Sequence, residues 1–526
     1  MLSSSSSGQG APDTSSASAP AACPKEAAEA RGVTEDREYS VFSPAMRTYL
    51  TYLLGLTMTL STLTATIYFP LIPMLSAELD VSIQAVNLTV TVYVVVQAVS
   101  PALFASLADA VGRRPVLLAL VATYAAATLG LVLSSALATG RAGYAALAAL
   151  RALQSLGGST TPPLAYGVAY DLAPVAERGA MLGPMLAFCN GVSAVGPVVG
   201  GGIALGTGGV AWVWLALLAV AVACLLLAGF TLPETARSVV GNGRLPATGV
   251  WRTWAPLPGA CRVASESEAR AGGDGPRTKT PECKWQPLRA LDSFRIILYP
   301  EAAAVLWMIA SSYAVYYTFQ VAVPVIFADV YGFDELQIGL VLLPGLAGMT
   351  LGGLLAGRLL DRNLALVARR RLGPDVGPEN AAAAARATDE FPLEAARYRR
   401  CQWFLLFMAA CVSGYGWAVD SGAHAAVPAV LQFFICAAST LLSHTASALL
   451  VDIFPSRPST AYASAQIARC GLSAVSSAVL QPLVDAVGRG WYFTIFALFI
   501  GITGSASMVV TRSKGGDWRR RRRETS

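Results

Sequence analysis

Long apolar segments recur along the whole chain, and the charged residues gather in blocks between them. A helix needs about 20 apolar residues to cross the hydrocarbon core of a bilayer. The sequence therefore predicts an all-α polytopic membrane protein with twelve transmembrane helices in two six-helix bundles. The predicted spans lie near residues 49–69, 84–106, 115–137, 143–168, 181–205, 211–231, 300–326, 337–359, 402–419, 427–451, 462–483 and 491–511.

Composition excludes the main soluble classes. Of the 526 residues, 54% are hydrophobic and only 13% are charged, whereas roughly 25% of the residues of an ordinary soluble protein are charged. The net charge of +6 comes from basic residues in segments that we predict to be cytoplasmic, so no nucleic-acid partner is expected. The chain has only 2 histidines and no CxxC pair or nucleophile–base constellation. We therefore expect no enzyme activity, no catalytic residues, no metal and no cofactor.

Lysine and arginine set the orientation of the predicted spans, because cytoplasmic loops carry an excess of positive charge. Placing both termini in the cytoplasm leaves only Arg141 and Arg489 in outward loops. The arginine run at 519–523 is then expected to anchor the tail to anionic lipid. The predicted parts are a disordered cytosolic tail (1–47), an N-terminal six-helix bundle (48–231), a cytoplasmic linker (232–298), a C-terminal six-helix bundle (299–511) with a cytoplasmic loop (361–400), and a basic cytosolic tail (512–526).

A short motif occurs once in each half, at the predicted cytoplasmic end of the second span. Its two copies are Asp109, Gly112, Arg113 and Arg114, and then Asp361 and Arg362. An acidic group at a helix end can accept hydrogen bonds from the amino terminus of a neighbouring helix. Adjacent arginines can pair with carboxylates across the interface between the halves. We predict a conformational switch, whose contacts are made in one access state and broken in the other.

The fifth predicted span is rich in glycine and contains a proline. Small residues allow helix backbones to approach closely, and a proline bends a helix. The residues concerned are Gly191, Gly196, Pro197, Gly200 and Gly201. The pattern predicts close helix packing at this span.

These motifs resemble those of a known family. The segment 107–116, LADAVGRRPV, is similar to the loop signature of the major facilitator superfamily, and the glycine spacing of the fifth span resembles the antiporter motif of its drug-export branch. Segments 63–70, 87–93, 232–235, 313–317 and 335–340 resemble the quinidine-resistance-type subfamily of fungal drug:proton antiporters, which is close to organic-acid exporters such as the citrate exporter. The resemblance implies two bundles that rock around a central cavity, a small-molecule cargo, a proton gradient as driving force, and no cofactor.

Ionisable side chains within a span are costly and indicate a functional site. Arg151 and Gln154 resemble a fourth-span motif that the family uses for proton coupling, and Arg469 and His444 lie within later spans. We predict these four as proton-coupling or substrate residues. The alternatives are snorkelling or carbonyl pairing for the arginines, and a hydrogen-bonded packing role for His444. No Asp or Glu lies clearly at mid-membrane, so the sequence leaves the proton carrier unidentified.

Two arginines within the spans would suit an anionic cargo, because guanidinium groups bind carboxylates. Similar arginines occur in relatives that move cations, so the charge of the cargo stays open. Mostly apolar walls with a few polar groups suit amphipathic ligands. The predicted cavity residues are Asn87, Tyr93, Gln97, Tyr166, Tyr316, Tyr317 and Gln320. Aromatic residues at span ends are alternatively part of the interfacial belt.

The predicted function is proton-coupled efflux, by alternating access, of a small organic molecule such as a drug, a secondary metabolite or an organic acid. The alternatives are facilitated uptake or exchange of a small nutrient, and a transporter-like sensor whose linker and tail signal to cytosolic partners. The expected partners are the cargo, protons and the lipid bilayer. We expect a monomer in the plasma membrane, with the vacuolar membrane as the alternative location.

Overall fold

The computed structural model describes residues 40–137, 140–173, 178–241, 243, 247, 249–254, 294–372, 391–454 and 458–525. Within these ranges every regular element is a helix. The N-terminal tail up to residue 39 and the linker from 255 to 293 lie outside the described residues, so the predictions of a disordered tail and a cytoplasmic linker remain predictions there.

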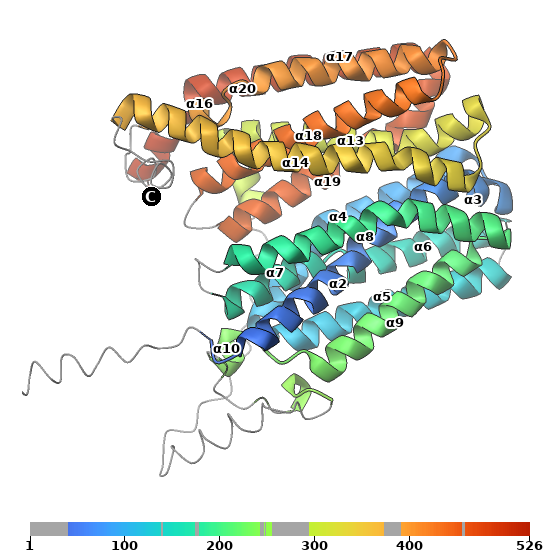
Figure 1. Ribbon diagram of the computed structural model, residues 1–526, viewed down its shortest axis with the longest axis horizontal. Coiled ribbons are helices and arrows are strands. Elements are labelled where there is room, and N and C mark those ends of the chain that lie inside the picture. Colours follow the sequence, from blue (N-terminus) through green and yellow to red (C-terminus); the bar gives the residue numbers. More distant parts are fainter. Residues whose placement is uncertain are drawn as a thin grey trace, which may run out of the picture. The chain divides into compact units, whose positions relative to one another are not determined.

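The helices of the first half begin close to the predicted spans (Figure 1). They are α2 (Pro44–Tyr68), η1 (Phe69–Leu71), α3 (Ile72–Glu78), α4 (Ile83–Val111), α5 (Arg113–Leu137), α6 (Gly140–Gly158), α7 (Thr161–Leu172), α8 (Arg178–Thr207), α9 (Ala211–Thr231), α10 (Arg237–Val240) and η2 (Gly249–Trp251). The second half contains α13 (Pro300–Tyr331), α14 (Glu335–Leu372), α16 (Leu393–Arg397), α17 (Cys401–Asp420), α18 (Ala426–Ile453), α19 (Pro458–Val487) and α20 (Arg489–Thr525).

Among the described residues, 11 helical segments are long and apolar enough to cross a membrane. The predicted span at 143–168 is divided into α6 and α7, because the chain leaves the helix at Ser159 and Thr160. Pro162 and Pro163 follow at once, and proline lacks the N–H that would continue the helical hydrogen bonds. The all-α polytopic fold is thus confirmed, and the segment predicted as the fourth span is a broken helix that is not among these 11.

Helices α2 to α9 pack mainly on one another, and so do α13 to α20. The two groups meet chiefly along two helix pairs, α4 with α19 and α8 with α14. In Figure 1, α8 and α14 converge toward the right-hand end and diverge toward the left. We call the end that carries Glu78, Tyr331 and Glu335 the outer end, following the predicted orientation, and the opposite end the inner end.

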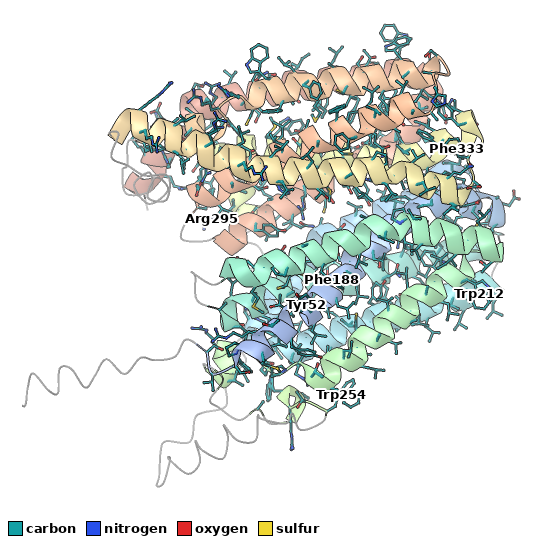
Figure 2. The ribbon with its side chains drawn as sticks, viewed as in Figure 1. Tyr52, Phe188, Trp212, Trp254, Arg295 and Phe333 are labelled. Carbon is teal, nitrogen blue, oxygen red and sulfur yellow. The ribbon has the colours of Figure 1, made fainter. Side chains whose placement is uncertain are left out.

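Large apolar side chains cover much of the helix surfaces. Trp403 is 73% exposed and Ile502 is 65% exposed. Tyr52 of α2 and Trp212 of α9, both labelled in Figure 2, are each 56% exposed. Extensive exposed apolar surface is unusual for a monomer in water, and here it suits contact with lipid.

Three boundaries differ from the prediction. Helix α2 begins at Pro44, inside the predicted tail (1–47), where Ser43 accepts a 3.3 Å hydrogen bond from the Met46 amide and so caps the helix. Helix α14 continues to Leu372, so the first part of the predicted loop (361–400) is helical. Helix α20 continues to Thr525, so the segment predicted as a basic tail (512–526) is a helical extension.

Candidate functional site

Arg151 of α6 is buried within the N-terminal half, with 1% of its surface exposed. Its guanidinium carbon lies 4.2 Å from the ring centroid of Tyr68 and 4.3 Å from that of Tyr93. Nη1 donates a 2.8 Å hydrogen bond to Gln154, whose amide donates a 2.9 Å bond to Thr128. Nε has no hydrogen-bond partner. The charge is therefore held by aromatic faces and neutral dipoles, and the arginine does not snorkel.

Arg469 of α19 is the corresponding cation of the C-terminal half, and it is partly buried. Its guanidinium carbon lies 5.0 Å from the ring centroid of Tyr313 and 5.9 Å from that of Tyr462. Its Nε also lacks a hydrogen-bond partner. Tyr166 of α7 and His444 of α18 lie close enough to Arg469 to interact with its charge. The charge of Arg469 therefore acts on side chains of both halves.

Tyrosines connect the two arginines across the interface between the halves. Tyr317 lies 6.1 Å from Tyr313, between ring centroids, and makes an edge contact with Phe69 of the other half at 5.9 Å. Tyr317 also lies close enough to Arg151 to interact with its charge. We call this assembly the central cluster; it consists of Arg151, Arg469, Tyr68, Tyr93, Tyr313 and Tyr317.

The remaining predicted cavity residues lie around the central cluster. Tyr316 packs on Tyr313 at 5.7 Å, between ring centroids. Gln97 is partly buried on α4, one helical turn from Tyr93. Asn87 and Gln320 are fully buried, and neither amide group has a hydrogen-bond partner among the described residues.

His444 is exposed on α18, beside a glycine of α14. This glycine is Gly353, and a Cβ atom on it would lie 3.5 Å from Cε1 of His444. A coupling or substrate role for His444 stays a prediction, and so does the alternative of a hydrogen-bonded packing role.

Glycines of α8 allow this helix to lie against α2. A Cβ atom on Gly200 would lie 2.4 Å from Cγ1 of Ile67, and one on Gly196 would lie 2.8 Å from Leu63. Gly191, the first glycine of the predicted motif, has nothing within 4 Å of that position. The motif is therefore a packing surface toward its outer end only.

Gly201 of the same motif faces the other half of the protein. A Cβ atom there would lie 2.1 Å from the backbone oxygen of Glu335, at the start of α14. In return, a Cβ atom on Gly339 would lie 2.6 Å from the backbone oxygen of Pro197. Backbone contacts this close are possible only without side chains. The predicted antiporter motif thus joins the two halves at the outer end.

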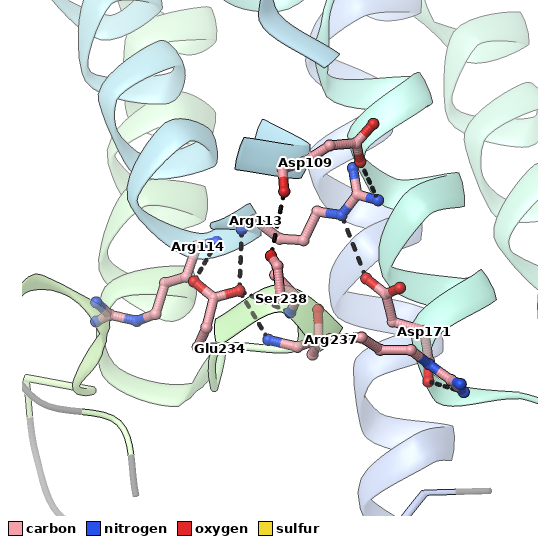
Figure 3. A network of polar contacts seen from close by, with 9 residues as sticks. Asp109, Arg113, Arg114, Asp171, Glu234, Arg237 and Ser238 are labelled. Carbon is pink, nitrogen blue, oxygen red and sulfur yellow. Dashed lines mark hydrogen bonds and ion pairs between the residues drawn. The ribbon is translucent and has the colours of Figure 1, made fainter. Parts of the chain in front are cut away.

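The motif between α4 and α5 forms an ion-pair network at the inner end (Figure 3). Arg113 pairs with Asp109 at 2.5 Å and with Asp171 of α7 at 3.2 Å. Glu234, which is buried after α9, accepts hydrogen bonds from the backbone amides of Arg113 and Arg114 at 2.9 and 3.2 Å. These amides begin α5, so the carboxylate caps the positive end of that helix.

The start of the predicted linker packs onto this network. Arg114 is 1% exposed and donates hydrogen bonds of 2.7–3.0 Å to the backbone oxygens of Gly229, Leu232 and Val250. Trp251 donates a 2.7 Å bond to the backbone oxygen of Val111. Residues 232–254 are thus a folded part of the N-terminal half wherever the structure describes them.

In this conformation Glu234 caps α5, and Arg113 pairs with Asp109 and Asp171 of its own half. The switch, whose contacts change between access states, stays a prediction. Gly112 has a φ of 124°, and a Cβ atom there would lie 2.6 Å from Oε2 of Glu234, so glycine is required. In the second copy, Arg362 is exposed, and the side chain of Asp361 lies outside the described residues.

Ion pairs also gather at the inner end of the C-terminal half. The pairs are Arg397–Asp452 at 2.6 Å, Arg522–Glu301 at 2.9 Å and Arg519–Glu394 at 3.6 Å. Arg519 and Arg522 therefore bind protein carboxylates, where the sequence predicted that they would bind anionic lipid. Burial raises the pKa of Glu394, and Arg519 opposes this rise.

Sequence reasoning did not identify several of these residues as part of a site. Glu234 stands in a segment used only for the family resemblance, although an acid directly after a span could have suggested a helix cap. Tyr68 and Tyr313 likewise stood in resembling segments. Glu301 and Arg522 are far apart in the sequence, and no local pattern links them.

A sequence profile of the Major Facilitator Superfamily matches residues 54–477, which is more than half of the 526-residue chain. The chain belongs to the Major Facilitator Superfamily. As a member of this family it is a membrane transporter of small molecules and not an enzyme. The family resemblance drawn from the motifs is thereby confirmed.

Fungal transporters of this superfamily are similar over most of the chain. MFS-type transporter phiD of a fungal species is 30% identical over 493 residues, covering 93% of this chain and 71% of that protein. Citrate exporter 1 of Aspergillus niger is 30% identical over 477 residues, covering 89% and 86%. Quinidine resistance protein 1 of Saccharomyces cerevisiae is 26% identical over 492 residues, covering 90% and 83%.

Solved structures of the superfamily share the fold. The D-xylose-proton symporter superposes with a TM-score of 0.59 at 16% identity, covering 88% of this chain and 96% of that one. The human organic anion transporter MFSD10 (TETRAN) gives a TM-score of 0.51 at 15% identity, covering 89% and 100%. At these identities the likeness concerns the fold alone.

Proposed function

We propose that this Major Facilitator Superfamily member exports a small organic molecule that carries a carboxylate or another anionic group. The observation that carries the proposal is the pair of arginines in the central cluster. Arg151 and Arg469 come from opposite halves, and each has an Nε without a hydrogen-bond partner. Unsatisfied guanidinium donors at the interface between two moving halves suit an anion that both halves bind in turn.

The surroundings of these two arginines support an anionic cargo. Among the described residues, the ion pairs of other arginines join them to Asp or Glu, whereas neither Arg151 nor Arg469 has such a pair. A buried charge without a counter-charge is costly. An anionic ligand would supply the missing charge when the cavity is occupied.

The relatives support export of this kind of cargo and also a second candidate. Citrate exporter 1, at 30% identity, is named for a carboxylate cargo. Quinidine resistance protein 1, at 26% identity, is named for resistance to a drug. The second candidate is therefore export of an aromatic drug, which the tyrosines of the central cluster favour because their faces bind apolar and cationic groups.

Further predictions from the sequence stay part of this proposal. They are coupling of efflux to an inward proton movement, with Arg151, Gln154, Arg469 and His444 as the residues involved, export of a secondary metabolite as one form of the cargo, and a monomer in the plasma or vacuolar membrane. Efflux of labelled carboxylates and fluorescent cations from cells expressing the chain, with and without a protonophore, tests the coupling.

Charge variants of Arg469 test the proposal directly. Arg469→Gln removes the charge and keeps hydrogen-bond donors, whereas Arg469→Lys keeps the charge. We expect labelled citrate or malate efflux to fall at least tenfold in Arg469→Gln and to be largely retained in Arg469→Lys, because the bound anion needs a cation (about 1.4 kcal/mol per tenfold). Efflux of a fluorescent cation should be unchanged. Equal loss of both probes would assign Arg469 a structural role and contradict the proposal.

A further inference from the structure

Two glutamines are buried in the C-terminal half without hydrogen-bond partners. Gln320 of α13 and Gln432 of α18 are each 0% exposed, and their amide nitrogen and oxygen atoms have no hydrogen-bond partner among the described residues. A buried amide without partners is costly, because it has lost its hydrogen bonds to water. Two such amides in one region indicate a binding partner from outside the chain.

The two glutamines lie at the same depth in the half. Tyr316 of α13 lies beside Gln320 and close enough to Cys436 of α18 to interact with it. A Cβ atom on Gly345 of α14 would lie 2.7 Å from Nε2 of Gln432 and 3.3 Å from Sγ of Cys436, so these two side chains are neighbours. Since α13 ends and α18 begins at the outer end, Gln320 and Gln432 each stand one helical turn outward of Tyr316 and Cys436. We call Gln320 and Gln432 the amide pair.

The chemistry of the amide pair selects the group that it can bind. An amide both donates and accepts hydrogen bonds, whereas a carboxylate only accepts them and an ammonium group only donates them. A hydroxyl group does both, so it can accept a bond from Nε2 of one glutamine and donate one to Oε1 of the other. The surroundings favour a small group, because a Cβ atom on Gly345 would already lie 2.7 Å from Gln432. The amide pair therefore suits a hydroxyl group.

The amide pair is within reach of a cargo that is bound at the central cluster. Tyr313, Tyr317 and Gln320 share one face of α13, because they follow one another at spacings of four and three residues. Gln320 lies roughly 5 Å from Tyr317 along the helix axis, and Tyr317 lies close enough to Arg151 to interact with its charge. A small acid can therefore place a carboxylate at Arg151 and a hydroxyl group at the amide pair.

We propose that the amide pair binds a hydroxyl group of the cargo, so that the exported anion is a hydroxycarboxylate. This inference rests on the proposed function, because it assigns the carboxylate of the cargo to the arginines. A site built to hydrogen-bond a hydroxyl group rejects the analogue that lacks it, since the buried polar groups of the site then stay unpaired. The amide pair thereby distinguishes acids of equal charge, which the arginines alone cannot do.

Acids that differ by one hydroxyl group test the inference on the purified full-length protein in liposomes. Malate and succinate carry the same carboxylates, and so do citrate and tricarballylate, but only malate and citrate have a hydroxyl group. Exchange of external labelled malate or citrate for the same internal acid is measured at one pH, above the carboxyl pKa values, while unlabelled acids compete from outside. We expect succinate and tricarballylate to compete at least about tenfold more weakly than malate and citrate. Equal competition within both pairs would overturn the inference.

Leucine variants show whether the amide pair causes this discrimination. Gln320→Leu and Gln432→Leu remove the amide groups at similar side-chain volume, and each should reduce the preference for malate over succinate at least about threefold. The melting temperature should not fall, because the replaced atoms have no partner within the protein to lose. Gln402→Leu is the matched control: this amide donates a 2.6 Å bond to Ser505 on α20, and its loss should leave the preference unchanged. A lower melting temperature with an unchanged preference would assign the amide pair a structural role and overturn the inference.

The outcomes separate this inference from the proposed function. If malate and citrate are exchanged and the hydroxyl group has no effect, the anionic cargo stands and the hydroxyl site is wrong. If none of these acids is exchanged, the proposed anionic cargo itself is wrong.

Discussion

The two ends of the membrane domain are held together by different physical means. At the outer end the two halves touch through backbone: Gly201 lies against Glu335, Gly339 lies against Pro197, and Gln84 donates a 2.8 Å hydrogen bond to the backbone oxygen of Ala478. At the inner end, the ion pairs join residues of the same half. The outer contact depends on the absence of side chains, and the inner networks depend on charge.

This difference has a consequence for alternating access. Close backbone contacts between the halves at the outer end, with ion pairs within each half at the inner end, describe an arrangement closed at the outer end. In the predicted orientation this end faces the outside. To open outward, the halves must separate at Gly201 and Glu335. The inner networks need not break for this step, because they lie within each half. We therefore expect substitutions at the outer end to act on transport, and those at the inner end to act on stability.

The largest effect is expected at Gly201. Gly201→Ala would place a Cβ atom 2.1 Å from a backbone oxygen of the other half, so the outer end cannot close without a shift. Overpacking of this kind costs about 1–3 kcal/mol, which shifts the balance between access states by about fivefold to about 150-fold. Transport should fall, and labelling of a cysteine introduced near the outer end should rise. Gly191→Ala, in open space on the same helix, is the matched control and should leave both unchanged.

The next largest effect is expected at Glu234, whose replacement should lower the stability of the fold. Its carboxylate accepts hydrogen bonds from the amides of Arg113, Arg114, Thr235 and Ala236. Glu234→Ala leaves these buried donors without an acceptor and removes the charge at the start of α5, at a cost of about 3 kcal/mol. Thermal unfolding in detergent should show a clearly lower melting temperature. Glu234→Gln keeps one acceptor oxygen and should recover part of the loss; a melting temperature equal to that of Glu234→Ala would show that charge alone matters.

An effect of similar or smaller size is expected in the C-terminal half. Arg397 and Asp452 form a buried ion pair, with 10% and 5% of their side chains exposed. Arg397→Ala leaves a buried carboxylate that has lost this partner, and such losses cost about 3 kcal/mol. Arg520 is the control. It forms an ion pair with Asp517 in which the two side chains are 60% and 62% exposed. Arg520→Ala should therefore cost less than about 0.5 kcal/mol. Equal melting temperatures for the two variants would contradict the assignment of the inner network as structural.

The smallest effect is expected at Arg519 and depends on pH. Burial raises the pKa of Glu394 above its usual 4.5, and Arg519 counteracts this. A raised pKa in the folded state means that stability falls as pH rises from about 4.5 through the folded pKa. Arg519→Ala removes the opposing charge, so this fall should become steeper. Its cost should be small near pH 4.5 and largest near neutral pH. It should stay below that of Arg397→Ala, because the Arg519–Glu394 distance is 3.6 Å and the Arg397–Asp452 distance is 2.6 Å.

A double variant checks the cause of that pH dependence. Glu394→Gln removes the titrating carboxyl, so adding Arg519→Ala to it should lower the melting temperature by the same amount at every pH. A pH-dependent difference between Glu394→Gln and the double variant would mean that another group is responsible.

Local patterns sufficed for much of the fold. Apolar segments of sufficient length predicted the crossing helices, since the hydrocarbon core requires them. The break at Ser159 and Thr160 was missed, although Pro162 and Pro163 follow directly, because the apolar run continues across it. The continuation of α20 was also missed, because the polar residues after 511 resemble a solvated tail when their partners are unknown.

For the candidate site too, some features followed from the sequence and others only from the tertiary structure. The sequence alone determined that Arg151 and Arg469 lie within spans and that no acidic residue lies deep inside one, because burial of charge in a membrane follows from position in the chain. It also determined that the fifth span packs closely. Only the tertiary structure decided that Gly201 touches the other half, that Glu234 caps α5, and that Arg519 and Arg522 bind carboxylates. These contacts join residues distant in the chain, and their partners are fixed by helix packing, which no local pattern records.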